Sequence, residues 1–284
     1  MTRFGHCRAA LKRAAFFIGA VLVAGLAGCA SADRFGGSRA AVVEWGAARG
    51  FDAQPLQLRK FRLLVMKRVS SVRRDAILNV YIEGDGAAWP TPFHPPRDPT
   101  PLEPMALAMA AADPAPAVAY LGRPCQYLDA AELAECSPAY WTDSRFAPEV
   151  VNAYMAFIDR LKVATDSSRV RLIGYSGGGV LATLLAARRG DVDRLITVAA
   201  PIAVAEWTAW HKSTPLIGSM DPVMAVKTPL ADAVHFVGGR DDVVPPRLVA
   251  GALPRIGGRL REVADFDHVC CWSRDWSRLL EETR

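Results

Sequence analysis

The strongest constraint on the fold of this chain is the stretch VRLIGYSGGGV, residues 170–180, where an apolar run leads into a serine enclosed by glycines. The apolar run over 169–173 shows no alternation, which is typical of a parallel strand buried on both faces. The alanine- and leucine-rich residues 177–189 predict a helix, and Gly190 is a typical residue to end it. A strand, a tight turn and a helix in this order predict a parallel sheet covered by helices.

The rest of the chain repeats this alternation of strands and helices. Strand-like apolar runs occupy 61–69, 76–82, 117–121, 195–199, 234–237 and 259–263, and helical patterns occupy 102–112, 148–164, 246–253 and 272–282. Residues 202–229, with tryptophan, methionine and two prolines, break the alternation and form a candidate lid. We therefore expect an α/β fold whose mostly parallel central sheet is flanked by helices and carries a small lid-like insertion.

The N-terminus has the features of a secretion signal. Four basic residues precede an apolar run over 14–27, which is too short to span a bilayer. The run ends in LAGC, residues 26–29, which resembles the bacterial lipobox, and the resemblance implies that residues 1–28 are removed and that Cys29 is lipidated. A plain hydrophobic helix, or a cleaved signal with an incidental cysteine, is the alternative.

A lipid on Cys29 would hold the mature protein at a membrane surface of the bacterial cell envelope. Ala30 and Ser31 lack the aspartate tied to inner-membrane retention, so we expect the periplasmic face of the outer membrane. Removal of residues 1–28 takes away four basic residues and no acidic one, so the formal net charge falls from +5 to +1. No basic cluster interleaves with aromatic residues, which argues against a nucleic-acid partner.

The length of the mature chain suits one domain over 60–284, preceded by a tether over 29–59 that is rich in alanine, glycine and arginine and could hold a short helix around 40–48. Cys125 and Cys136 lie 11 residues apart in one long loop, and an oxidising compartment favours a disulfide between them. The adjacent Cys270 and Cys271 could form a vicinal disulfide or remain thiols. No C-x-x-C spacing occurs, so we expect no zinc site and no other metal.

The stretch GYSGG matches the pattern G-x-S-x-G, with its members at Gly174, Tyr175, Ser176, Gly177 and Gly178. In a nucleophile elbow the serine has strained backbone torsions, so residues two positions away on either side must lack side chains. The N–H of Gly177, at the helix N-terminus, would stabilise a developing oxyanion. The alternative is an ordinary glycine-rich turn, but the flanking strand and helix favour a nucleophile.

A serine hydroxyl is a poor nucleophile near neutral pH and needs a base. His268 is our candidate, because it lies between the last expected strand and the last expected helix, where a sheet of this kind presents its final loop. His235 lies inside an apolar strand, which indicates a structural role. His94 lies in a proline-rich loop and His211 in the candidate lid.

The base in turn needs a carboxylate to fix its tautomer. Asp241 and Asp242 follow the strand over 234–237. The residues Gly238, Asp241, Val244 and Pro245 match the pattern G-x-x-D-x-x-V-P, which favours Asp241 and leaves Asp242 as the alternative acid.

A second oxyanion donor is expected from the stretch VYIEGDGAAW, residues 80–89. Gly84 and Gly86 let the backbone turn inward, so the N–H of Asp85 or of Gly86 would face the serine. A phosphate or metal loop is the alternative, but the acidic residues would repel phosphate and make only a weak metal site.

Ser176, Asp241 and His268 occur in the order found in α/β-hydrolases, and residues 60–284 resemble that superfamily. The resemblance implies a mixed, mostly parallel sheet of about eight strands with the site at the strand carboxyl ends. The segments GRPCQY, CSPAYWTDSRFAPEVV, GYSGGG and DHVCCW resemble, more narrowly, a group of bacterial lipoprotein hydrolases. One departure is Glu83-Gly84, which stands where the superfamily usually has His-Gly.

We therefore expect a serine hydrolase of the esterase or lipase type that forms an acyl-enzyme and uses no cofactor, with a small ester-like substrate. A peptidase, a thioesterase or an envelope-polymer hydrolase would use the same three residues, and a non-catalytic lipoprotein on a hydrolase fold is the alternative outside enzymes. Trp207, Trp210, Met220 and Met224 either line an apolar acyl pocket or pack the candidate lid.

Overall fold

The computed structural model describes residues 35–58, 60–70, 76–87 and 94–283. The expected signal peptide and Cys29 lie outside the described residues. From Phe35 onward the chain forms a unit of its own. Within the described ranges, no helix is both long enough and apolar enough to cross a membrane.

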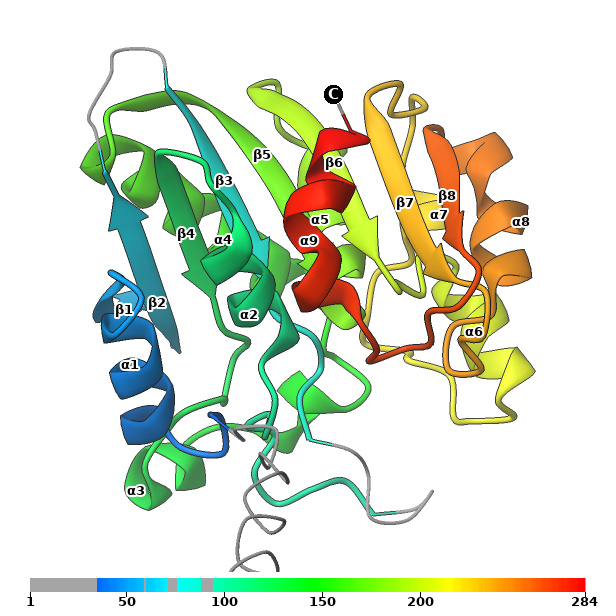
Figure 1. The fold of residues 1–284 in the computed structure, drawn as a ribbon. Helices are drawn as coiled ribbons and strands as arrows, with labels where there is room; N and C mark the ends of the chain where they lie inside the picture. Colours follow the sequence, from blue (N-terminus) through cyan, green and yellow to red (C-terminus); the bar gives the residue numbers. More distant parts are fainter. Residues whose placement is uncertain (1–34, 59, 71–75, 88–93, 284) are drawn as a thin grey trace, which may run out of the picture. The chain divides into compact units, whose positions relative to one another are not determined.

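The described chain builds one sheet with the strand order β1-β2-β4-β3-β5-β6-β7-β8 (Figure 1). The strands are β1 (Asp52–Leu58), β2 (Phe61–Val69), β3 (Ala76–Ile82), β4 (Ala117–Leu121), β5 (Ser167–Tyr175), β6 (Val192–Val198), β7 (Ala233–Gly238) and β8 (Arg259–Val263). β2 pairs antiparallel with both β1 and β4, and the other neighbours pair in parallel. The expected mixed, mostly parallel sheet is confirmed.

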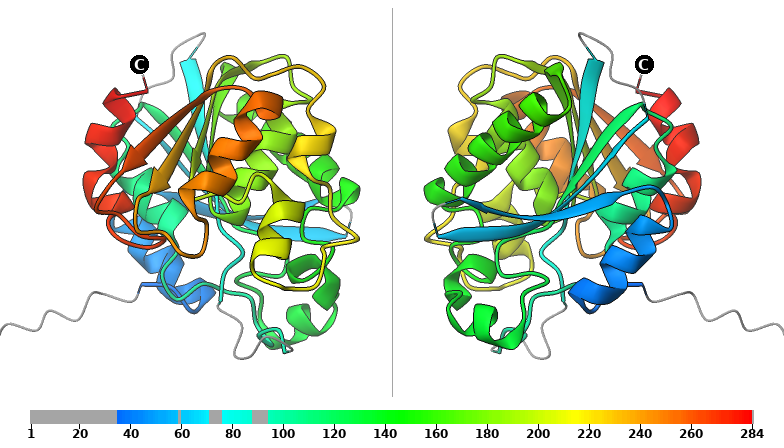
Figure 2. Two further views of the ribbon diagram at one scale, coloured as in Figure 1. Left: turned by 90° about the vertical axis from the view of Figure 1, so that its right-hand side faces the viewer. Right: turned by 90° about the vertical axis from the view of Figure 1, so that its left-hand side faces the viewer.

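Helices cover both faces of this sheet (Figure 2). One face carries α1 (Arg39–Ala47), α2 (Met105–Ala112) and α9 (Trp272–Glu281), and the other carries α4 (Pro148–Ala164), α5 (Gly177–Ala186), α7 (Pro222–Ala225) and α8 (Pro246–Ile256). The short helices α3 (Ala130–Ala134), η1 (Pro138–Trp141) and α6 (Val204–Trp210) belong to the connections.

The apolar run of β3 shows why these central strands lack a polar face. Leu78, Val80 and Ile82 pack into the core under α4 and α5, whereas Tyr81 packs into the core under α2 and α9. Alternate side chains therefore enter two separate cores, and both cores require apolar residues. This arrangement fixes the register of β3 and, with it, the point at which the chain leaves the sheet beside the serine.

The expected tether over 29–59 is wrong for residues 52–58, which form β1, whereas the short helix expected around 40–48 is present as α1. β1 pairs with β2 from Asp52 opposite Lys67 to Leu58 opposite Phe61, and Val42 and Phe51 are buried. The sequence DAQPLQL hides this strand because β1 lies at the sheet edge, where a proline and exposed polar side chains are tolerated. The folded domain therefore begins well before residue 60.

The carboxyl ends of the parallel strands lie together at the lower edge of the sheet in Figure 1. We call this edge, with the loops that leave it, the catalytic edge. The segment over 202–229 leaves it after β6 and includes α6 and α7. Two hydrogen bonds hold residues 219 and 220 of this segment against Phe146. Phe146 N donates to Ser219 Oγ over 3.0 Å, and Met220 N donates to the Phe146 carbonyl over 3.1 Å.

Candidate active site

Ser176 lies at the turn between β5 and α5 with φ 49° and ψ −124°, a conformation that is costly for a residue with a side chain. The glycine spacing follows from packing at this turn. A Cβ atom on Gly174 would collide with the backbone of Gly178, and one on Gly178 would collide with the carbonyls of Ile82 and Glu83. The turn therefore holds the serine only because both positions lack side chains.

The structure brings Ser176, His268 and Asp241 together from three loops of the catalytic edge. His268 Nε2 lies 3.2 Å from Ser176 Oγ, and His268 Nδ1 lies 3.0 Å from Asp241 Oδ2. The imidazole therefore bridges the hydroxyl and the carboxylate through its two nitrogens. This is the geometry in which an imidazole can take a proton from a serine while a carboxylate stabilises the resulting imidazolium.

Asp241 is held in this position by its own loop. Its Oδ1 accepts hydrogen bonds from the N–H groups of Val243 (2.9 Å) and Val244 (2.7 Å), which leaves Oδ2 to face the imidazole. The Asp241 side chain is fully buried, whereas Asp242 is exposed. Of the two adjacent acids, Asp241 is the one that contacts His268.

The backbone of His268 is fixed by two groups that the sequence analysis did not single out for this role. The Tyr175 hydroxyl donates to the His268 carbonyl over 3.0 Å, and the Trp272 indole N–H donates to the same carbonyl over 3.1 Å. Tyr175 precedes Ser176 and Trp272 begins α9, so the turn that carries the serine and the helix that follows the histidine both help to position the base.

The turn after β3 lies directly beside the serine. A Cβ atom on Gly84 would come within 3.4 Å of Ser176 Cβ and 3.1 Å of the Tyr175 ring, so only glycine permits this approach without displacing a neighbour. Asp85 follows at once, and its carboxylate occupies the space that a Gly177 side chain would need. Within the described part of the chain, the N–H groups of Asp85 and Gly177 have no hydrogen-bond acceptor.

We expected the second donor to be Asp85 or Gly86. Gly86, with φ 94°, lies instead against the carbonyl of Pro99 and the side chain of Gln126. Gln126 Nε2 also donates to the Gly84 carbonyl over 3.1 Å. Among the described residues the Gly86 N–H, like the Asp85 N–H, has no acceptor, so hydrogen bonding does not separate the two candidates; Asp85 is the residue that lies against Gly177.

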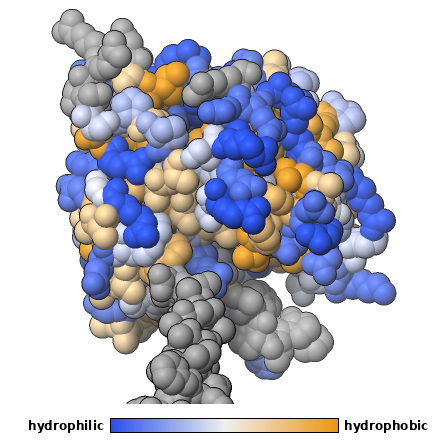
Figure 3. All heavy atoms as spheres, viewed as in Figure 1, coloured by the Kyte–Doolittle hydropathy of each residue, from blue (hydrophilic) through white to orange (hydrophobic). Residues whose placement is uncertain are grey.

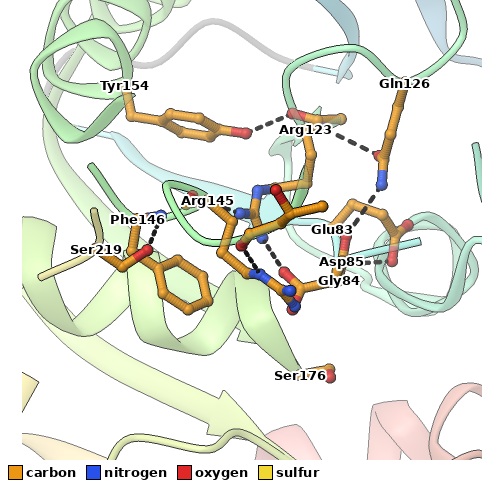
Figure 4. A network of polar contacts seen from close by, with 12 residues as sticks. Glu83, Gly84, Asp85, Arg123, Gln126, Arg145, Phe146, Tyr154, Ser176 and Ser219 are labelled. Carbon is orange, nitrogen blue, oxygen red and sulfur yellow. Dashed lines mark hydrogen bonds and ion pairs between the residues drawn. The ribbon is translucent and has the colours of Figure 1, made fainter. Parts of the chain in front are cut away.

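Two buried arginines hold the Asp85 side chain (Figure 4). Arg123 Nη1 lies 2.8 Å from Oδ1, Arg145 Nη1 lies 2.7 Å from Oδ2, and the arginine side chains are 3% and 8% exposed. Burial alone would raise the pKa of the Asp85 carboxyl, but both guanidiniums outweigh it, so this pKa lies below its usual value. Two cations on one anion leave net positive charge beside the turn, which favours a developing oxyanion.

The two arginines also bind the neighbouring backbone. Arg123 Nη2 donates to the Arg145 carbonyl over 2.8 Å, and Arg145 Nε donates to the Thr142 carbonyl over 2.6 Å. The sequence analysis missed this cluster, although both arginines lie in segments, GRPCQY and TDSRF, that it quoted. Nothing in these two segments marks the arginines as partners of Asp85, which lies 38 and 60 residues away from them.

Glu83, which stands where the superfamily usually has histidine, anchors the same turn from the other side. Its Oε1 accepts hydrogen bonds from the N–H groups of Gly84 (2.9 Å) and Ala106 (3.3 Å), and Ala106 lies in the first turn of α2. Glu83 therefore caps α2, whose own N-cap residue, Pro104, makes no side-chain cap. Burial raises the pKa of the Glu83 carboxyl to about 7, although these N–H groups partly oppose the rise.

The remaining expected features lie around this site. A disulfide joins Cys125 to Cys136. A second disulfide joins the adjacent Cys270 and Cys271, which come shortly after His268 in the chain. Among the described residues, no three histidine, cysteine, aspartate or glutamate side chains form a group that could hold a metal ion.

His235 is fully buried, and its ring lies 2.8 Å from Thr197 Oγ1 and 3.2 Å from the Gly257 carbonyl. Burial lowers the pKa of His235 to about 4, so the ring is neutral near pH 7. His211 Nε2 lies 2.8 Å from the Val243 carbonyl. Neither ring is the partner of Ser176.

The four side chains considered for an acyl pocket differ in exposure and in the neighbours that they contact. Trp210 is 48% exposed and Met224 is 73% exposed, whereas Met220 packs against the core beneath α4 and α5. Trp207 donates its indole N–H to the Val243 carbonyl over 2.7 Å. These contacts favour packing of the segment over a shared acyl pocket.

No protein-family model matches this chain, and no curated protein sequence matches it significantly. Solved structures do match. An α/β serine hydrolase homologue from Coxiella burnetii superposes with a TM-score of 0.53 at 14% identity, over 82% of this chain and 95% of that one. The esterase Pf2001 of Pyrococcus furiosus gives 0.56 at 13% identity, over 84% and 93%.

Est1E of Butyrivibrio proteoclasticus, solved with ferulic acid bound, gives a TM-score of 0.56 at 12% identity, over 81% of this chain and 99% of that one. Identities this low report on the fold and not on the substrate. The strand order, the helical layers and these similar structures lead to one conclusion. The chain has the α/β-hydrolase fold.

Proposed function

We propose that this protein is a serine hydrolase that cleaves carboxylic esters through an acyl-enzyme. The observation that carries the proposal is the continuous contact from Asp241 through His268 to Ser176, with 3.0 Å and 3.2 Å between the bonding atoms. A fold alone does not require a hydroxyl, an imidazole and a carboxylate to meet at the catalytic edge.

In the first half-reaction, Ser176 Oγ attacks the ester carbonyl carbon while His268 Nε2 takes the hydroxyl proton. Negative charge develops on the carbonyl oxygen, where the N–H groups of Gly177 and Asp85 stabilise it. The tetrahedral intermediate then expels the alcohol, which receives its proton from His268. In the second half-reaction water attacks the acyl-enzyme, with His268 again as the base, and releases the acid.

An ester is the favoured substrate because its alcohol leaves with only the proton that His268 supplies. We also propose that the chain is lipidated on Cys29 and works at the periplasmic face of the outer membrane. The Cys125–Cys136 disulfide is consistent with that oxidising compartment.

The test is hydrolysis of p-nitrophenyl esters of graded acyl length, compared with thioesters and peptide anilides. We expect ester hydrolysis by the wild type and its loss in Ser176→Ala, which removes the nucleophile. Ser277→Ala is the matched control, because that serine is exposed on α9 and only donates to the Ala112 carbonyl. Activity on peptide anilides alone, or on thioesters alone, would show that the proposed ester specificity is wrong and that the substrate belongs to that other class. Ester hydrolysis that survives in Ser176→Ala would refute the mechanism.

A further inference from the structure

The first described residues are bonded to the catalytic edge. Gly36 N donates to the Leu102 carbonyl over 3.0 Å, and Gly37 N donates to the Pro101 carbonyl over 2.8 Å. Both acceptors belong to the connection from β3 to α2, which begins with the turn beside Ser176. Arg39, the first residue of α1, donates to the Tyr127 carbonyl in the loop after β4 over 2.6 Å.

The length of chain before these contacts limits where an anchor can lie. Cys29 and Phe35 are six residues apart. A fully extended chain covers about 3.4 Å per residue, so a lipid on Cys29 reaches no farther than about 20 Å from Phe35. If Cys29 carries a lipid, this limit would keep the catalytic edge, where the folded unit starts, nearer to the membrane than the opposite edge.

Of the large apolar side chains that are exposed among the described residues, all but Val163 lie in segments that follow the carboxyl ends of the parallel strands. They are Leu102 (53% exposed) after β3, Trp210 (48%), Ile217 (87%) and Met224 (73%) after β6, Val243 (38%) after β7 and Val269 (49%) after β8. On the face that carries α9, by contrast, hydrophilic residues are interspersed among the apolar ones (Figure 3).

The Trp210 ring also stacks on a cation, since the Arg247 guanidinium carbon lies 3.6 Å from the ring centroid. A tryptophan next to a basic side chain suits the boundary between lipid headgroups and acyl chains, where an amphipathic ring is favoured.

We propose that the catalytic edge docks on the lipid surface to which Cys29 is anchored, and that the active site takes its ester from an amphiphile resident in that surface. This inference rests on the proposed ester hydrolysis and on the proposed lipid anchor. The short anchor sets the orientation, and the exposed apolar side chains enter the headgroup boundary, where their burial is favourable. The ester of an acyl lipid then reaches Ser176 without leaving the membrane.

Contact is tested with the full lipidated protein in phosphatidylethanolamine–phosphatidylglycerol vesicles whose acyl chains carry bromine, which quenches tryptophan fluorescence. We expect quenching in the wild type, its loss in Trp210→Phe, and its retention in Trp276→Phe, since the Trp276 side chain is fully buried in the folded protein. Equal emission in brominated and unbrominated vesicles, for a protein whose mass shows the lipid, would overturn the docking. A mass without lipid would overturn the anchor and the docking together.

Substrate delivery is tested with a matched pair of variants. Ile217 is 87% exposed on the catalytic edge, and Val163 is 85% exposed at the end of α4, next to the amino end of β5. We expect Ile217→Ser to lower the rate on a long-chain p-nitrophenyl ester in vesicles by about tenfold. Its rate on soluble p-nitrophenyl acetate should stay unchanged, and Val163→Ser should change neither rate.

The two rates separate the outcomes of this second test. Equal vesicle rates for the two variants, with the soluble ester still cleaved, would overturn the inference and leave the proposed hydrolase intact. Failure of the wild type on both esters would overturn the proposed function itself.

Discussion

Replacement of Arg145 by methionine tests how the turn beside the serine is held. Methionine keeps most of the length of the side chain but removes the 2.7 Å ion pair with Asp85 and the 2.6 Å bond to the Thr142 carbonyl. Asp85 then keeps only Arg123, so its carboxylate can rotate and its N–H is no longer fixed toward the oxyanion. We therefore expect slower catalysis in a protein that still folds.

The magnitude follows from burial and from the kind of bond that is lost. Arg145 is 8% exposed and Asp85 is 27% exposed, so solvent screens the pair only in part. Breaking a buried ion pair costs about 3–5 kcal/mol of stability, and the partial exposure of Asp85 places the expected loss near about 2–3 kcal/mol. Removal of an oxyanion donor lowers kcat by about 10²–10³-fold, so a donor that is displaced rather than removed should cost about 10–100-fold.

The assay measures kcat and KM on a p-nitrophenyl ester together with urea unfolding. Because the oxyanion forms only in the transition state, the loss should appear in kcat with little change in KM. Arg278→Met is the control, since Arg278 is 56% exposed in a surface pair and its removal should cost less than about 0.5 kcal/mol. Arg145→Lys should recover part of kcat by restoring the charge. A folded Arg145→Met with wild-type kcat would refute this role for the cluster.

Three further predictions concern the buried Glu83, the glycines at positions 174 and 251, and the Cys125–Cys136 disulfide. Burial raises the pKa of Glu83 from 4.5 to about 7, so the folded chain keeps a proton that the unfolded chain loses. The free energy of unfolding should therefore fall by about 3 kcal/mol between about pH 4.5 and 7, and Glu83→Gln should remove this fall. The same pH dependence of the urea-derived free energy of unfolding in both proteins would contradict the prediction. Gly174→Ala should destabilise the protein by more than about 2 kcal/mol, because the new Cβ atom collides with the backbone of Gly178. Gly251→Ala, in open space within α8, should stabilise the protein by about 0.5–1 kcal/mol. Equal melting temperatures for the two variants would contradict both predictions. Replacing Cys125 and Cys136 by serine should cost about 3 kcal/mol for a loop of this length, and an unchanged urea midpoint would show that the bond does not contribute.

Much of the fold could be predicted because the central strands enter two apolar cores. The ranges expected for β2, β3, β4 and β8 agree with the structure, since each is an apolar or alternating run with clear ends. β1 could not be predicted in this way, because an edge strand exposes one face and tolerates Pro55. Helix α2 begins at Met105 and not at Leu102, since Pro104 precedes its first turn.

In the candidate site, too, some residues could be predicted from the sequence and others could not. Ser176, Asp241 and His268 could be singled out because each follows an expected strand, and parallel strands bring their carboxyl ends to one edge. The partners of Asp85 could not, because Arg123 and Arg145 lie 38 and 60 residues away in irregular loops. Their contacts depend on how those loops pack, and no local pattern in the sequence encodes that packing.

The most direct test of the account is the reaction of the folded protein with a fluorophosphonate, followed by intact mass and peptide mapping. We predict one adduct, on Ser176, whose formation is slowed by about 10³-fold or more in His268→Ala, because the hydroxyl then lacks its base. A folded wild-type protein that remains unmodified, or an adduct on another residue, would contradict the claim that Ser176, His268 and Asp241 form a catalytic unit.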